Sequence, residues 1–174
     1  MNKKALIIGY GNPVRGDDRV GWEVAERLVY GLGDPSVTIM TVHQLAPELC
    51  EAIQQADLTI FVDASSEGKP GTWKYECVKP SATYVPSLGH HFDIAGLLAY
   101  ARYLYHSCPK AMVVSVAAQS FACCDDLSPC VENAVPHVVR FIGEQIAILQ
   151  GFEPRNNQSW PKEEKLPLAL PPTL

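Results

Sequence analysis

A short glycine-containing loop near the amino terminus constrains the fold more than any other feature of the chain. The loop, residues 9–18, follows the apolar run 5–8 and precedes residues 20–32, in which apolar side chains recur at four-residue steps. An apolar run bounded by charge and glycine is typical of a buried strand, and four-residue spacing is typical of one helix face. The chain therefore begins with a strand, a tight turn and a helix. The turn delivers two adjacent carboxylates, Asp17 and Asp18, to the top of the helix.

Strand-like and helix-like segments alternate along the rest of the chain. We expect strands at residues 5–8, 37–42, 58–62, 72–77 and 111–117, and helices at about 20–32, 46–56, 92–105 and 128–150. The segment 72–77 alternates like an edge strand, and Pro136 either kinks or divides the last helix. Such alternation favours a parallel sheet. We predict an α/β fold: a single three-layer domain with a mostly parallel twisted sheet and helices on both faces.

Length and composition fit one domain, residues 1–150, followed by a proline-rich carboxyl-terminal tail, residues 151–174. The 174 residues suffice for a sizeable core, and the apolar fraction of 47% is that of an ordinary globular protein. The tail interleaves prolines with polar residues and has too little apolar surface to order itself alone.

The charge pattern argues against nucleic acid and membranes as partners. The net charge is −5 and no lysine or arginine cluster occurs. No apolar run approaches the roughly 20 residues that span a bilayer. The apolar stretch of the first nine residues is too short for a signal peptide, so we expect a cytoplasmic protein. The sequence does not determine the oligomeric state.

Six cysteines occur without a CxxC spacing, which argues against a zinc site. We expect Cys50, Cys77 and Cys108, each in an apolar context, to be buried reduced thiols. The adjacent pair Cys123 and Cys124 is either redox-sensitive, a soft-metal ligand or two ordinary loop thiols.

The first loop suits a cation or acid–base chemistry better than a phosphate. The third glycine of a GxGxxG motif would fall on Val14, no lysine is present, and two carboxylates would repel a phosphate. The alternative is that Asp17 or Asp18 only caps the helix that begins near Val20.

Further polar residues follow or precede other strands. Asp63 comes after the third strand, and His90 and His91 precede the helix after the edge strand. The carboxyl ends of neighbouring parallel strands meet in one crevice, so Asp18, Asp63 and one histidine could lie together there. Two carboxylates and one imidazole form an open coordination sphere that suits nickel or zinc rather than calcium. The alternatives are that Asp63 only caps the strand end and that the histidines form a solvated turn.

Two observations bear on a reaction at this edge. His43 and Gln44 follow the second strand and either line a substrate groove or lead into the next helix. No serine lies in a GxSxG turn, and neither Cys123 nor Cys124 has a base nearby in the sequence. The chain therefore lacks the marks of a familiar nucleophilic protease.

Four segments resemble the hydrogenase maturation endopeptidases, which trim the carboxyl-terminal extension from the large subunit of nickel-iron hydrogenases. The segments span about residues 4 to 150 and are Gly9-x-Gly11-Asn12-Pro13-x-x-x-Asp17-Asp18-x-x-Gly21, Phe61-Val62-Asp63-Ala64, Gly89-His90-His91 and Leu127-Ser128-Pro129-x-Val131-Glu132-x-Ala134-Val135. Two departures occur: Arg19 stands where the family usually has glycine, and residues 123–126 replace a glycine-containing loop.

The resemblance implies that Asp18, Asp63 and His90 contact nickel already inserted in the hydrogenase large-subunit precursor, with no metal required in the free enzyme. A slip of one residue would replace His90 by His91. Asp18 and Asp63 are the implied catalytic residues. Either the metal polarises the scissile carbonyl, or a carboxylate, Asp18 or Asp17, activates a water. The alternatives are a Rossmann-like nucleotide-binding protein and a non-catalytic module that docks to a metalloprotein.

Overall fold

One twisted sheet organises the chain in the computed structural model, which describes residues 3–82 and 92–152. Five strands lie in the order β2-β1-β3-β5-β4. The strands are β1 Ala5–Tyr10, β2 Val37–Val42, β3 Leu58–Ser65, β4 Trp73–Val78 and β5 Lys110–Ala117. All pairs are parallel except the antiparallel pair of β5 with β4, which lies at the edge as predicted. The predicted fold class is confirmed.

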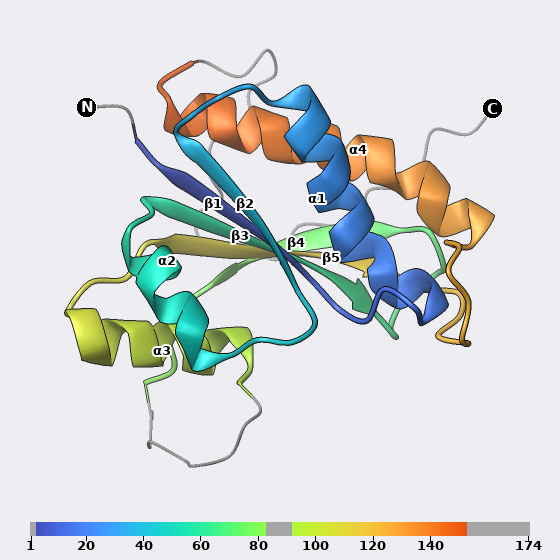
Figure 1. Ribbon diagram of the computed structural model, residues 1–174, viewed down its shortest axis with the longest axis horizontal. Helices are drawn as coiled ribbons and strands as arrows, with labels where there is room; N and C mark the ends of the chain where they lie inside the picture. The colour runs from blue at the N-terminus through green and yellow to red at the C-terminus, as the bar shows by residue number, and fades with distance from the viewer. Residues whose placement is uncertain (1–2, 83–91, 153–174) are drawn as a thin grey trace.

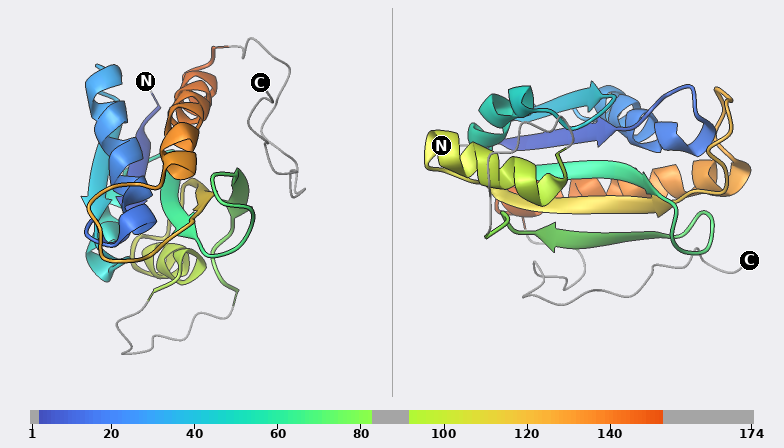
Figure 2. Two further views of the ribbon diagram at one scale, coloured as in Figure 1. Left: turned by 90° about the vertical axis from the view of Figure 1, so that its right-hand side faces the viewer. Right: turned by 90° about the horizontal axis from the view of Figure 1, so that it is seen from below.

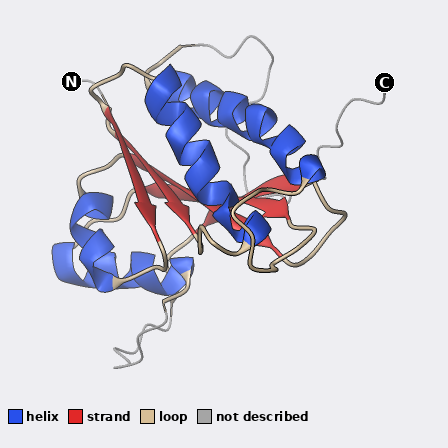
Figure 3. Cartoon of the chain, turned by 45° about the vertical axis from the view of Figure 1, so that its right-hand side comes forward, coloured by secondary structure: helices blue, strands red, loops and turns tan. Residues whose placement is uncertain are grey.

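Helices cover both faces of the sheet (Figures 1 and 3). The pair α1, Val20–Gly31, and α4, Pro129–Leu149, covers one face, while α2, Cys50–Gln54, and α3, Ile94–Tyr105, cover the other (Figure 2). Short 3-10 helices, η1 at Gly16–Arg19 and η2 at Pro47–Leu49, lead into α1 and α2. The last helix is continuous through Pro136, so this proline does not divide it.

Strand β1 lies inside the sheet, between β2 and β3, and is apolar over residues 5–8. Ile7 packs into the core beneath α1 and α4, whereas Leu6 and Ile8 pack into the core beneath α2 and α3. A strand that is buried on both faces needs apolar side chains in both directions. The run 5–8 therefore predicted a buried strand without revealing which side chain faces which helix pair.

Two glycines allow the start of α1 to approach the sheet closely. A Cβ atom at Gly9 would lie 2.0 Å from the carbonyl oxygen of Gly21, and one at Gly21 would lie 2.5 Å from the carbonyl oxygen of Val62. No side chain fits at either position. This contact sets the 3-10 helix η1, which carries Asp17 and Asp18, beside the carboxyl ends of β1 and β3.

Some predictions about single residues need correction or lie outside the described chain. Asp63 lies inside β3 rather than after it, because pairing with β5 continues to Ser65. Cys50 is buried as predicted and Cys108 is half-buried, but the prediction for Cys77 is wrong: its place on the edge strand β4 leaves it exposed.

The predicted ligands His90 and His91, and the tail from residue 153, are not among the described residues. Within the parts of the chain that the structure describes, no helix combines the length and the apolar character needed to cross a membrane.

Candidate functional site

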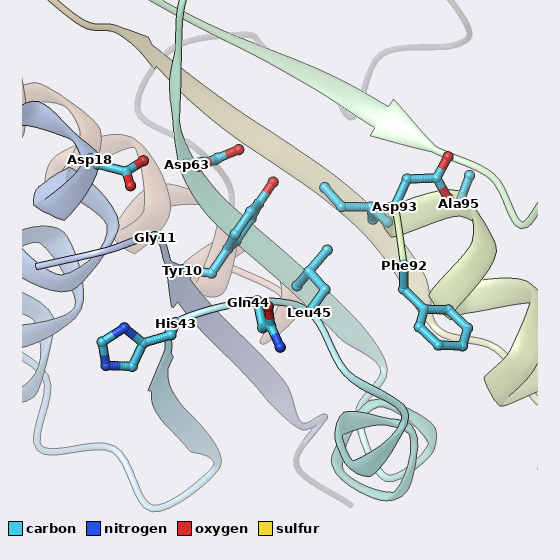
Figure 4. Close-up of a pocket in the computed structure, with 11 residues that line it drawn as sticks. Tyr10, Gly11, Asp18, His43, Gln44, Leu45, Asp63, Phe92, Asp93 and Ala95 are labelled. Atoms are coloured by element: carbon cyan, nitrogen blue, oxygen red, sulfur yellow. The ribbon is translucent and has the colours of Figure 1, made fainter. Parts of the chain in front are cut away.

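A cleft of about 440 Å³ lies at the carboxyl ends of β1, β2 and β3 (Figure 4). Its walls come from the loop after β1, the loop after β2, the end of β3 and the segment that enters α3. The lining residues are Tyr10, Gly11, Asp18, His43, Gln44, Leu45, Asp63, Phe92, Asp93, Ile94 and Ala95. The cleft therefore lies where an open α/β sheet is expected to bind a ligand.

Asp18 is held in the cleft by the turn that precedes it. Its Oδ2 accepts a hydrogen bond from the backbone N–H of Asn12 at 3.0 Å. Gly11 has a φ of 131°, and a Cβ there would lie 2.1 Å from the carbonyl oxygen of Asp18, so only glycine fits. The Trp22 indole N–H donates to the carbonyl of Gly11 at 3.0 Å. The alternative of a helix cap is wrong for Asp18, because no side chain caps α1.

Asp63 lies in the same cleft and in a less polar environment. Burial raises the pKa of its carboxyl to about 6, and the negative charge of Asp18 adds to the rise. The Tyr10 hydroxyl and the Ala64 backbone N–H act in the opposite direction. A carboxyl that titrates near neutrality can either bind a cation or exchange a proton with a bound water.

Tyr10 is a site residue that no motif of the sequence indicates. Its hydroxyl points toward the carboxylate of Asp63 (Figure 4). Burial, followed by the negative charge of Asp63, raises the pKa of the Tyr10 hydroxyl well above its usual value, so the hydroxyl keeps its proton. The available signal was positional: Gly9 pairs with Val62, so the next residues of the two parallel strands, Tyr10 and Asp63, are neighbours.

Asp17, although adjacent to Asp18, does not line the cleft. It is fully buried, and its carboxylate accepts backbone N–H groups from Gln119 at 2.7 Å, Ser120 at 2.9 Å and Ser128 at 2.6 Å. Burial alone would raise the pKa of Asp17, but these hydrogen bonds outweigh it and lower the pKa. The expectation that Asp17 caps α1 is wrong, and its buried, bonded oxygens are poorly placed to activate a water.

The remaining walls of the cleft are mixed in character. His43 and Gln44 line the wall contributed by the loop after β2. The His43 ring packs edge-on against Trp22, with ring centroids 5.4 Å apart. Phe92, Ile94 and Leu45 supply apolar surface on the side of α3. An extended peptide could place a polar group near the carboxylates and an apolar side chain near α3.

Asp18 and Asp63 meet in one cleft, as the strand-end pattern predicted. Among residues 3–82 and 92–152, no group of three or more histidine, cysteine or acidic side chains could hold a metal ion. The third predicted ligand, His90, falls outside these ranges. The described part of the site thus contributes two carboxylates, Asp18 and Asp63, to the cleft.

The cysteine pair plays no part in this cleft. Cys123 and Cys124 are exposed free thiols, and neither lines the cleft. Cys124 instead belongs to the segment between β5 and α4, where its backbone pairs with the loop after β1.

Comparison with known proteins gives matches among solved structures. No family model and no curated protein matches the sequence. The hydrogenase maturating endopeptidase HybD from E. coli superposes with a TM-score of 0.69 at 23% identity, over 85% of this chain and 94% of that one. The NiFe hydrogenase maturation protease HycI from Thermococcus kodakarensis KOD1 gives a TM-score of 0.67 at 23% identity, over 83% of this chain and 93% of that one.

A third solved structure is similar to the same extent. The hydrogenase 2 maturation peptidase from Thaumarchaeota archaeon SCGC_AB-539-E09 has a TM-score of 0.65 at 22% identity, covering 84% of this chain and 99% of that one. Each of these structures is matched over nearly its whole length. The sequence resemblance and the structural matches point to the same group of proteins, and the chain has the fold of the hydrogenase maturation proteases.

Proposed function

We propose that the chain is an endopeptidase that removes the carboxyl-terminal extension of a nickel-iron hydrogenase large-subunit precursor after nickel insertion. One observation carries the proposal: Asp18 and Asp63, from two separate motifs of the resemblance, line one cleft at the carboxyl edge of the sheet. The similar solved structures are named as maturation proteases, and their fold supports the same proposal.

In this proposal the nickel belongs to the substrate. Asp18, Asp63 and His90 would contact the nickel in the precursor and so distinguish a loaded precursor from an empty one. Two carboxylates and an imidazole leave open coordination positions, which the ligands of the precursor can fill. The free enzyme then needs no metal of its own.

Hydrolysis of the peptide bond needs an activated water in this proposal, since the cleft-lining residues that the structure describes include no serine or cysteine. Asp17 is poorly suited to accept a proton from that water, because it is fully buried and lies outside the cleft, whereas Asp18 and Asp63 both line it. The nickel of the precursor would polarise the scissile carbonyl.

The two rival functions make different predictions about the same cleft. A nucleotide-binding protein needs a loop that binds phosphate with backbone N–H groups or cationic side chains. This cleft instead has two carboxylates at that place, and they repel phosphate. A docking module without activity would bind the precursor and leave its length unchanged.

The experiment compares processing of purified precursor, with and without nickel, by the wild-type chain and single variants. We expect the wild type to shorten only the nickel-loaded precursor and Asp18→Ala to reduce the cleavage rate at least about 100-fold, as expected when a catalytic electrostatic group is removed. Gel mobility reports the cleavage, and circular dichroism checks the fold.

Cys123→Ala is the matched control, because Cys123 is exposed and outside the cleft. It should cut at the wild-type rate. Full processing by Asp18→Ala, or loss of processing in folded Cys123→Ala, would contradict the proposal and indicate thiol chemistry. An uncut precursor bound stably by the wild type would indicate the docking module.

A further inference from the structure

The two adjacent aspartates of the loop after β1 have opposite surroundings. Asp18 is half-buried and faces the cleft, whereas Asp17 is fully buried on the side of the segment 118–128, which connects β5 to α4. We propose that Asp17 is a positioning residue, whose carboxylate fastens the loop that carries Asp18 to the segment 118–128. Its importance for processing rests on the proposed function, but its effect on the position of Asp18 does not.

The side-chain bonds of Asp17 reach both ends of this segment. Oδ2 accepts the N–H groups of Gln119 and Ser120, directly after β5, and Oδ1 accepts the N–H of Ser128, which immediately precedes α4. One carboxylate therefore ties the loop after β1 to the exit of a strand and to the entrance of a helix. These partners are between 102 and 111 residues away in the sequence.

Backbone bonds continue the same contact on the side away from Asp18. The N–H of Asp17 donates to the Ser120 carbonyl at 3.0 Å, and the N–H of Gly16 donates to the Cys124 carbonyl at 2.7 Å. The N–H of Cys124 in turn donates to the Val14 carbonyl at 3.2 Å. The loop is thus docked along residues 14–17, and Asp18 is the next residue in the chain.

The position of Asp17 requires a side chain that can accept several hydrogen bonds at once. A carboxylate only accepts hydrogen bonds and can receive all three N–H groups, whereas an asparagine side chain has the same shape but presents an NH₂ group on one side. In Asp17→Asn the side-chain NH₂ group therefore faces at least one buried backbone N–H, which loses its acceptor. The substitution tests the hydrogen bonding and leaves the volume of the side chain nearly unchanged.

The readout is the backbone N–H of Asn12, because it donates to Asp18 Oδ2 and so reports where the Asp18 carboxylate lies. Amide hydrogen exchange is measured by NMR on the full-length chain. We expect the Asn12 amide to exchange at least tenfold faster in Asp17→Asn than in the wild type.

Val138→Ala, a truncation of a fully buried residue of α4, serves as the control for a general loss of stability. In Val138→Ala, the exchange of the Asn12 amide should accelerate by no more than the exchange of the core amides in β1. Equal acceleration of Asn12 in both variants, or unchanged protection in Asp17→Asn, would overturn the positioning role.

A second variant keeps the inference testable if Asp17→Asn does not fold. Ser128→Pro removes both donors that Ser128 directs at Asp17, the backbone N–H and the side-chain hydroxyl, at a residue whose φ of −60° proline can adopt. It should accelerate Asn12 exchange in the same direction, and an unchanged rate would count against the inference. In the processing assay, Asp17→Asn should lower kcat. A wild-type chain that cuts no precursor would refute the proposed function and leave the exchange result standing.

Discussion

At the scale of single residues, Asp63 lies at a buried position where the charged form of its carboxyl is disfavoured. Its pKa is raised to about 6 from an ordinary value of 3.8, chiefly by burial, so the folded state holds the proton more tightly than the unfolded state. The stabilisation from that proton is complete below pH 3.8 and is lost as pH rises through about 6. We therefore expect Asp63→Asn to raise the free energy of unfolding at pH 7 by about 1–3 kcal/mol, while it abolishes processing.

Urea unfolding at pH 7 and at pH 4 checks this prediction, since the gain should nearly vanish at the lower pH. Asp126→Asn, at an exposed position near the start of α4, should change stability little at either pH. A gain for Asp63→Asn that is the same at both pH values would show that burial of the charge is not its cause.

At the scale of elements, the contact between α1 and the sheet is limited by its glycines. A Cβ atom at Gly21 would lie 2.5 Å from the Val62 carbonyl oxygen and 2.8 Å from backbone atoms of Tyr10. Gly21→Ala must therefore push α1 away from β1 and β3, at a cost of about 1–3 kcal/mol or more. Because α1 follows η1 directly, we also expect slower processing. Thermal unfolding and the processing assay measure the two effects.

Gly143→Ala in α4 is the matched substitution, since nothing lies within 4 Å of the Cβ it would add. It should stabilise the protein by about 0.5–1 kcal/mol, the ordinary helix preference of alanine over glycine. If Gly21→Ala and Gly143→Ala had the same effect, close approach would not be the reason for glycine at position 21.

At the scale of the whole molecule, α4 closes the fold near residue 150. The Gln150 side-chain amide donates to the Lys3 carbonyl at 2.8 Å and to the Ser36 hydroxyl at 2.7 Å, which joins the end of α4 to the residues just before β1 and β2. We expect a chain that ends at Phe152 to keep its free energy of unfolding within about 0.5 kcal/mol, the usual range of changes away from a core. Urea unfolding measures the difference.

A chain that ends at Gly143 provides the comparison. It loses the buried side chain of Ile146, and we expect a loss of at least about 2–5 kcal/mol, as for truncation of a large core residue. A loss above about 1 kcal/mol for the chain that ends at Phe152 would contradict the assignment of residues 151–174 to a tail outside the domain.

The sequence was informative where a physical cause acts locally or through the parallel sheet. The run 5–8 is apolar because β1 is buried on both faces, and Asp18 meets Asp63 because parallel strands bring their carboxyl ends together. The role of Asp17 could not be predicted, because its partners lie more than 100 residues away and donate mainly backbone N–H groups, which any residue carries. The exposure of Cys77, by contrast, could have been inferred, because the segment 72–77 was already predicted to be an edge strand.

The bond between Asp17 and Ser128 has a consequence for the order of events during protein synthesis. The two residues are 111 positions apart, so at about 5–20 residues per second the ribosome needs roughly 5–20 s to add the second after the first. Until Ser128 has been made, the loop that carries Asp18 lacks the hydrogen bond between Asp17 and the residue before α4. A nascent chain therefore completes the residues that line the cleft well before it completes the hydrogen bonds that fasten the loop carrying Asp18.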